Sequence, residues 1–492
     1  MSSSGANVTA ADIASLTAQM ENMTVVINSM WISLNTFLIF VMQAGFAMLE
    51  AGTIREKNVQ GNLVKNLLDV IICTATFFFF GYGFAFGEDV GGFIGNSLFA
   101  ADGFEGTDNY MLFVFHWCFA STAATIISGS LAERTHIAAY VVTSAFTTAF
   151  TYPVVAHWVW GGGWLSELGY HDFAGDGPVH MVGGIAGFVG CLIVGPRKDR
   201  FDEGTYALNT HTSYAHAFIY SMYISTCLFI NTYAHTYLCS YMHTYIHSLL
   251  HMWTFMCSAK ADEFRPSNAP MVVLGTLLLW FGWYGFNCGS TLAFENDYSA
   301  PKVAMNTTLA AAAGGLMAFF IDYMGGNRKS KYRIVPITNG ILAGLVSITG
   351  GCDQFTSVGA IIIGCGGGVV LAVVSDLLVK YRVDDPLDAT TVHGACGFWG
   401  IMSIGLFSQD SGVFYGGDGR QLWVQFIGAA SITLWSGGLS GTLYLVLKYF
   451  KILRTSPSEE ESGMDHADCG GSAYSFNSKD VMKNFLLRFQ EF

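Results

Sequence analysis

Two histidines, His180 and His393, lie at the starts of apolar stretches in opposite halves of the 492-residue chain. An ionisable group within a membrane-spanning helix is costly, so its presence there indicates a functional role. Two neutral imidazoles can hydrogen-bond to each other and line a narrow path, which suits the passage of a small polar molecule or a proton. The alternative is two unrelated histidines, each hydrogen-bonded to helix backbone.

The residues around the two histidines repeat at matching spacings. An aspartate precedes each histidine by eight positions (Asp172 and Asp385), and a glycine follows each by four (Gly184 and Gly397). The two stretches are five predicted helices apart, and units of five helices must insert with opposite topology, which predicts an inverted repeat with a substrate site near the membrane midplane. Chance similarity between two glycine-rich helices is the alternative.

The composition requires a membrane environment. The chain is 52% hydrophobic and only 12% charged, whereas soluble proteins carry about 25% charged residues. A net charge of -13 argues against a nucleic-acid surface, which needs clustered Lys and Arg. Eleven cysteines at irregular spacings indicate neither a disulfide framework nor a zinc site, so we expect no metal and no cofactor.

Apolar windows of about 20 residues, the length that crosses a bilayer core, predict an all-α membrane protein with eleven transmembrane helices. Five lie in the first half and six in the second. The predicted spans are 29–52, 66–86, 111–131, 137–156, 178–195, 268–293, 303–324, 335–350, 356–379, 392–409 and 421–449.

The distribution of Lys and Arg sets the predicted orientation, because cytoplasmic loops carry the positive excess. With the N-terminus outside and the C-terminus inside, the outer side holds only Lys302 and Arg420. The predicted outer loops are acidic and would concentrate cations, although topology alone also accounts for them. The basic residues of the predicted inner side are Arg55, Lys57, Lys65, Arg134, Arg197, Lys198, Arg200, Arg265, Arg328, Lys329, Lys331, Arg333, Lys380, Arg382, Lys448, Lys451 and Arg454.

The segment from Thr205 to Ala259 has no Asp, Glu, Lys, Arg, Gly or Pro, but it holds eight Tyr, six His and three Cys. Three interpretations remain open: translated non-coding sequence, two extra spans around 214–231 and 237–257, or a metal-binding loop. His243, His247 and His251 have the helical spacing that a metal site could use. The segment must add zero or two spans, because one would invert the loops that follow.

These features divide the chain into five parts. We expect an extracellular N-terminal segment, a first half of the membrane-spanning domain, an anomalous insert, a second half, and a cytosolic tail. Their bounds are 1–28, 29–204, 205–261, 262–449 and 450–492.

Seven stretches of the sequence stand out as motifs: AGFAMLEAG (44–52), SGSLAER (128–134), HWVWGGGWL (157–165), DFAG (172–175), VHMVGG (179–184), EFRPSNAPMVVLGTLLLWFGWYGFNCGS (263–290) and DDPLDATTVHGACGFWG (384–400). They resemble the motifs of the ammonium transporter/methylammonium permease/Rhesus superfamily, and most of all those of its plant and algal members. The resemblance implies a plasma-membrane homotrimer with one pore per subunit, eleven helices in a five-plus-five inverted repeat, and passage of ammonium, ammonia or methylammonium without enzymatic chemistry.

The resemblance also assigns an outer recruitment site. Trp160 and Ser290 match its residues, with Phe119 beside them, and an ammonium ion there would gain cation–π attraction and a hydrogen bond to the serine oxygen. Asp172 matches the family's buried acid near this site. It would stabilise the cation at long range or cap backbone groups.

The resemblance places a gate and a relay below the recruitment site. Phe119 and Phe286 match the stacked pair that closes the pore, and His180 and His393 match the paired histidines. Ammonium would lose its proton near the gate, and ammonia would pass, with H⁺ moving separately. Asp388 matches the second-half acid that orients backbone near the inner mouth.

The tail contains GMD (463–465), which is similar to the cytosolic tail that couples neighbouring subunits in plant and algal members. Their phosphorylated threonine is replaced by Ala467, so Ser456, Ser458 or Ser462 are alternative sites for a regulatory kinase, and a PII-like protein is a further expected partner. The sequence thus predicts ammonium transport. An ammonium sensor that signals through the tail is the alternative.

Overall fold

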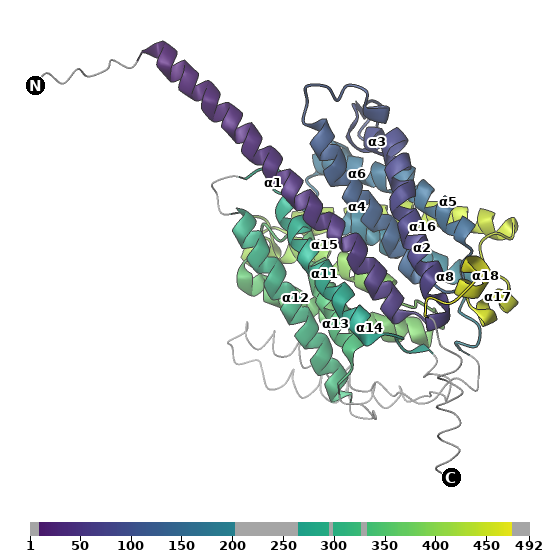
Figure 1. The fold of residues 1–492 in the computed structure, drawn as a ribbon. Helices are drawn as coiled ribbons and strands as arrows, with labels where there is room; N and C mark the ends of the chain where they lie inside the picture. Colours follow the sequence, from purple (N-terminus) through teal and green to yellow (C-terminus); the bar gives the residue numbers. More distant parts are fainter. Residues whose placement is uncertain (1–8, 202–263, 295–298, 326–331, 475–492) are drawn as a thin grey trace, which may run out of the picture.

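The computed structural model describes residues 9–201, 264–294, 299–325 and 332–474 (Figure 1). The anomalous segment 205–261, with its predicted metal-binding histidines, lies outside the described residues. The regular secondary structure of the described chain is helical apart from one hairpin of two-residue strands, β1 (Asp89–Val90) and β2 (Ile94–Gly95), which pair antiparallel. The prediction of a mainly helical protein is therefore confirmed.

In the first half of the chain, several spans are continuous helical rods in which α-helical and π-helical pieces alternate. The elements are α1 (Ala10–Thr53), η1 (Glu56–Asn58), α2 (Val59–Thr76), η2 (Phe77–Gly81), α3 (Tyr82–Phe86), η3 (Phe99–Ala101), α4 (Asn109–Ser130), α5 (Ile137–Phe146), η4 (Thr147–Thr151), α6 (Tyr152–Trp160), α7 (Trp164–Leu168), η5 (Asp176–Met181) and α8 (Val182–Val194). Of these, η2, η4 and η5 are π-helical turns.

Among the described residues of the second half, the helices are mostly uninterrupted, and η8 is the one π-helical turn. Its elements are α11 (Ala269–Gly289), α12 (Ser299–Met324), α13 (Ile334–Thr349), α14 (Ser357–Lys380), η8 (Thr390–Ala395), α15 (Cys396–Phe407), η9 (Val413–Tyr415) and α16 (Arg420–Tyr449), followed in the tail by α17 (Pro457–Ser462) and α18 (Met464–Cys469).

Within the described part of the chain, nine helices are long and apolar enough to cross a membrane. They coincide with nine of the eleven predicted spans. The other two predicted spans, 335–350 and 392–409, fall on α13 and on η8 with α15, which are also helical. The protein is thus a multi-pass helical membrane protein.

Helix α1 is longer than the predicted first span. It begins at Ala10 rather than near residue 29, and its 44 residues extend as a straight rod past the rest of the bundle (Figure 1). Thr9 and Asp12 close a capping box at its start, which satisfies free backbone N–H groups there. The polar segment before the first span is therefore largely helical in the described residues.

Small residues let the long helices approach closely. Helices α1 and α11 lie side by side along much of their length. A Cβ on Gly275 would lie 2.3 Å from the Leu49 backbone nitrogen, and one on Gly45 would lie 2.9 Å from the Leu279 nitrogen. Close backbone packing of this kind drives helix association in membranes, where hydrophobic burial contributes little.

The bundle interior contains ionisable side chains. Glu50 of α1 is 1% exposed, and its carboxylate lies 3.5 Å from Lys65 Nζ and accepts a hydrogen bond from Asn62. Leu67, five residues after Asn62 on α2, is 66% exposed. Apolar side chains outside and paired polar groups inside are the arrangement that a lipid environment favours.

Candidate functional site

The two histidines singled out in the sequence lie in direct contact at the centre of the bundle. Their Nδ1 atoms are 3.2 Å apart, and the rings are nearly parallel, with centroids 5.2 Å apart. Both side chains are buried, and Nε2 of His180 has no hydrogen-bond partner among the described residues. The pair therefore offers a free ring nitrogen in an apolar surrounding, as a hydrogen-bonding path for a small molecule requires.

Glycines at matching positions allow the two histidine-bearing helices to cross. A Cβ on Gly184, four residues after His180, would lie 2.1 Å from the Gly394 amide nitrogen. A Cβ on Gly397, four residues after His393, would lie 3.4 Å from the Cβ of His180. The glycine of each helix thus packs against the histidine-bearing turn of the other helix, so the contact is reciprocal.

Both histidines lie on π-helical turns, and an aspartate caps each turn. Asp172 accepts hydrogen bonds from the backbone nitrogens of Gly175, Asp176 and Gly177, at 2.7–3.0 Å. Asp385 accepts from Thr390 N at 2.7 Å and from Leu387 N at 3.3 Å.

Two phenylalanines cover the histidine pair on one side. The rings of Phe119 and Phe286 stack with centroids 4.1 Å apart and planes 22° apart, and both side chains are buried. Phe286 also contacts His180, at 5.6 Å between ring centroids. Trp283, one turn earlier on α11, also stacks on the His180 ring, and the two ring centroids lie 5.2 Å apart.

Trp160 extends this line of rings. Its ring lies 6.0 Å from that of Phe119 in a T-shaped arrangement, and its Nε1 donates to the Asp172 carbonyl oxygen at 2.8 Å. Trp160 is only partly buried. Ser290 lies one helical turn beyond Phe286, and its hydroxyl donates to the Phe286 carbonyl oxygen at 2.9 Å, which leaves the oxygen lone pairs as acceptors.

His116 belongs to this aromatic group although the sequence analysis did not single it out. Its ring centroid lies 5.9 Å from that of Trp160 and 6.0 Å from that of Phe119. It is buried, and its Nδ1 has no partner in the described structure. The sequence did contain a signal that could have identified His116: it is an ionisable residue, rare within an apolar span, and it lies one turn before Phe119.

Asp388, predicted to orient backbone at the inner end, makes a different contact. Its carboxylate accepts a hydrogen bond from Asn339 Nδ2 at 3.3 Å, whereas the side chain that accepts from backbone nitrogens here is Asp385. The matching spacing of Asp172 and Asp385 was thus the more informative pattern. In the described ranges, no three or more His, Cys, Asp or Glu side chains come together in a group that could hold a metal ion.

The chain is similar to known proteins over most of its length. The model of the Ammonium Transporter Family matches residues 30–219 and 252–474. An ammonium transporter 1 member 3 of Solanum lycopersicum is 35% identical, with 94% of this chain and 97% of the relative covered. An ammonium transporter 1 member 1 of Arabidopsis thaliana is 36% identical over 88% of this chain and 82% of its own. This chain belongs to the ammonium transporter family.

Solved structures give the same result. A protein described as a sensor Amt protein superposes with a TM-score of 0.75 at 32% identity, covering 91% of this chain and 99% of its own. Mep2 of Candida albicans superposes with a TM-score of 0.70 at 25% identity, covering 88% and 87%. The family is one of membrane transporters rather than enzymes, which confirms the resemblance found in the motifs.

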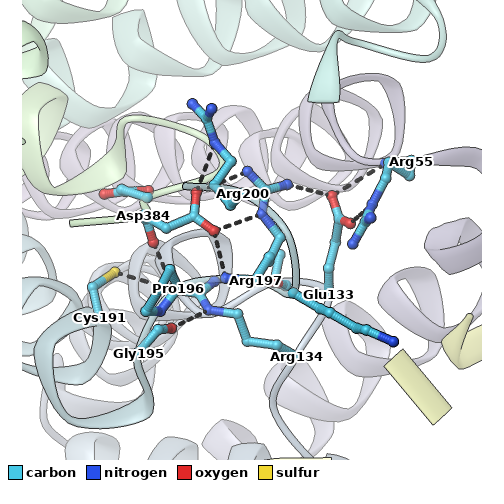
Figure 2. Close-up of polar contacts among 12 residues, drawn as sticks. Arg55, Glu133, Arg134, Cys191, Gly195, Pro196, Arg197, Arg200 and Asp384 are labelled. Carbon is cyan, nitrogen blue, oxygen red and sulfur yellow. Dashed lines mark hydrogen bonds and ion pairs between the residues drawn. The ribbon is translucent and has the colours of Figure 1, made fainter. Parts of the chain in front are cut away.

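A second cluster of buried polar side chains lies close to the C-terminal ends of helices α4, α8 and α14 (Figure 2). Arg197 forms a bidentate ion pair with Asp384, at 2.8 and 2.9 Å, and contacts Glu133 at 2.7 Å. Glu133 also pairs with Arg55, and Arg200 lies 3.4 Å from Asp384. We call these five residues the cytosolic charge cluster, following the predicted orientation.

Opposite charges compensate for burial throughout the cluster. Burial alone would raise the pKa of Glu133, but Arg197 and Arg55 hold it below its ordinary value. For Asp384, burial is likewise outweighed by Arg197, which lowers its pKa. Phe264 adds cation–π contacts, since its ring centroid lies 4.8–5.3 Å from the guanidinium carbons of Arg55, Arg197 and Arg200.

The C-terminal tail of this transporter packs against the same end of the bundle. Asp465 of the GMD motif is buried, and its carboxylate accepts a hydrogen bond from Gly61 N at 2.9 Å. The buried Glu460 contacts Lys198 N at 2.5 Å and Arg454 at 2.8 Å. Ala467, which replaces the threonine that is phosphorylated in plant and algal members, is exposed.

Proposed function

We propose that this chain conducts ammonium by binding NH₄⁺ at Trp160, deprotonating it near the phenylalanine gate, and passing NH₃ along the paired histidines. The observation that carries this proposal is the unbroken line of ring contacts. From Trp160 to Phe119, Phe286, His180 and His393, successive centroids lie 6.0, 4.1, 5.6 and 5.2 Å apart.

The chemistry of this line changes along its length. Trp160 and Phe119 present π-faces, which attract a cation by about 0.5–2 kcal/mol, and the lone pairs of Ser290 add an acceptor. Beyond the stacked phenylalanines the groups are neutral, and a bare cation there would cost from about 2.5 to more than 10 kcal/mol. Deprotonation at the gate, with the proton either returning to the outer water or moving separately along the histidine pair, removes most of this cost. The free nitrogen of His180 gives NH₃ a hydrogen-bonding partner.

Asp172 acts in this proposal through the backbone it holds. Its carboxylate caps the π-helical turn that carries His180, and its carbonyl oxygen orients Trp160. It therefore links the recruitment site to the relay. Its negative charge also favours a cation nearby at long range.

The proposed architecture has eleven transmembrane helices in a five-plus-five inverted repeat, with the N-terminus outside, in a plasma-membrane homotrimer. The reciprocal glycine contacts of the two histidine helices support the repeat. So do the two aspartate caps, which occupy matching places in the two halves.

We further propose that the tail regulates the pore. The burial of Asp465 and Glu460 against the cytosolic end supports a tail that transmits a change to the helix ends. Ser456 caps α17 and is exposed, so a kinase could reach it. A PII-like protein is the other proposed tail partner.

Transport is tested by expressing the chain in cells that lack ammonium uptake and measuring growth on low ammonium. Rescue is expected, and a surface-localised chain that gives no rescue would contradict transport. Voltage-clamp current compared with labelled uptake then shows whether a charge crosses with each ammonium. Equal charge and ammonium flux would mean that H⁺ moves with NH₃, or that NH₄⁺ passes intact.

An ammonium sensor is the second proposed function. The observation that favours it is the likeness to the sensor Amt protein, which is covered almost completely. In this case the same outer site would bind ammonium, and the tail would carry the signal. Ammonium-dependent protection of the tail from proteolysis, without any uptake, would favour sensing over transport.

A further inference from the structure

The part of α1 that projects beyond the bundle carries a regular apolar stripe. We call residues 10–28 the stalk. Its large apolar side chains are exposed, with Met20 at 70%, Met23 at 63% and Ile13 at 57%. Such a stripe in water requires a covering partner.

The spacing of the stripe identifies the kind of partner. Apolar residues recur at alternating intervals of three and four residues, which is the a/d pattern of a coiled coil, with a period of 3.5 rather than the 3.6 of a single straight helix. The exposed members are Ile13, Leu16, Met20, Met23, Ile27, Met30, Leu34 and Phe37. Asp12 and Glu21, the charged residues of the stalk, lie off the stripe.

We propose that the stalk forms a parallel coiled coil with the stalks of other copies of this chain. The inference rests on the proposed function, which places the stalk outside the membrane and assembles the chain as a homotrimer. Copies inserted with the same orientation start their α1 helices at the same height. Their stripes are therefore parallel and in register without any further device.

The stripe is continuous with the membrane-embedded part of α1. Leu34 and Phe37 lie within the predicted first span and are 55% and 67% exposed on the same stripe. Nearby, Val26, Ser29, Met30 and Ser33 line a shallow groove along the helix. A contact between subunits in the membrane would thus extend outward along the stalk.

Cysteine cross-linking tests this proposal in membranes containing the full chain. No native cysteine precedes Cys73. Met23→Cys, at a d position, should form a disulfide-linked dimer on mild oxidation, at a yield on the order of tenfold above Ala18→Cys, at an outward f position. The unmodified chain gives the background from its native cysteines.

Each other result overturns the coiled coil. Equal yields at both positions would mean a stalk without a fixed interface. A trimer by size with no cross-link at Met23→Cys would reject the coiled coil but leave the proposed homotrimer standing, and absence of any oligomer would reject both. Protection of Met23→Cys from an aqueous maleimide, without a cross-link, would place the stalk on lipid or on another protein.

A second pair of variants separates the interface from folding. Met20→Glu with Met23→Glu places charges at the core of the coil and should weaken subunit association on the order of tenfold, measured by dilution in detergent. Ala11→Glu with Ala18→Glu adds the same charge at exposed f positions and should leave association unchanged. Equal effects of the two pairs would contradict the proposal.

Discussion

The histidine pair and the cytosolic charge cluster are both buried groups of polar side chains, but they differ in how far their polar atoms are satisfied. In the cluster, Arg197 alone donates four short hydrogen bonds to two carboxylates: its backbone nitrogen, Nε and Nη2 donate to Asp384, and Nη1 donates to Glu133. In the pore, His180 Nε2 has no partner among the described residues. Dense pairing of the kind that Arg197 makes holds a structure together, whereas an unpaired ring nitrogen in the pore leaves room for a substrate.

The largest expected effect concerns the histidine pair in the pore. His180→Ala or His393→Ala should lower ammonium uptake on the order of 100-fold or convert the permeating species, because the proton-accepting path is interrupted. Uptake of labelled substrate and current should be measured in parallel. His466→Ala, at an exposed tail histidine, is the matched control. Unchanged flux and selectivity in both pore variants would remove the histidines from the mechanism.

The cluster should respond in stability rather than in selectivity. Glu133→Ala leaves Arg55 and Arg197 without a shared carboxylate and should destabilise the protein by about 3–5 kcal/mol, the usual cost of breaking a buried pair. Thermal unfolding in detergent measures this change. Glu461→Ala breaks the exposed pair with Lys198 and should cost about 0–1 kcal/mol. A selectivity change without a stability change would reverse the assignment.

The recruitment site should show a smaller effect, confined to affinity. Trp160→Leu removes a cation–π contact of about 0.5–2 kcal/mol, so the apparent KM should rise by about 2- to 30-fold. Trp423→Leu, at a position 62% exposed on α16, makes the same change away from the site. An unaltered KM in the Trp160 variant would argue against cation binding there.

The smallest expected effect is the pH dependence of the cluster. The folded pKa values of Glu133 and Asp384 lie below their ordinary values. Their contribution to stability is therefore complete above the unfolded pKa of about 4 and is lost as the pH falls below it. Melting temperatures between pH 6 and pH 3 should fall less steeply for Glu133→Gln than for the unmodified chain. A steeper fall in the variant would contradict this sign.

The two regions also differ in how well the sequence predicted them. His180 and His393 were evident because ionisable residues are rare in apolar spans. The cluster was not, since Arg55 and Glu133 are far apart in the sequence and basic residues near helix ends were already explained by topology. Local patterns contain no information about which opposite charges meet.

Helix ends show a similar limit. Hydropathy placed the start of the first span near residue 29, because polar residues between Ala14 and Thr24 lower the window average. The signals for a longer helix were the capping pair of Thr9 and Asp12 and the 3–4 spacing that begins at Ile13. Both are short-range patterns that a hydropathy window does not detect.

The π-helical turns at the two histidines have a consequence for sequence alignment. A π-helical turn accommodates one residue more than an α-helical turn, so every side chain beyond it is rotated by about 100° relative to an uninterrupted helix. A one-residue alignment gap within Asp176–Met181 or Thr390–Ala395 therefore corresponds to a rotation of the side chains that follow about the helix axis. It does not simply shift them along that axis. An alignment that misplaces such a gap would exchange the pore-facing and lipid-facing sides of the helix in a distant relative.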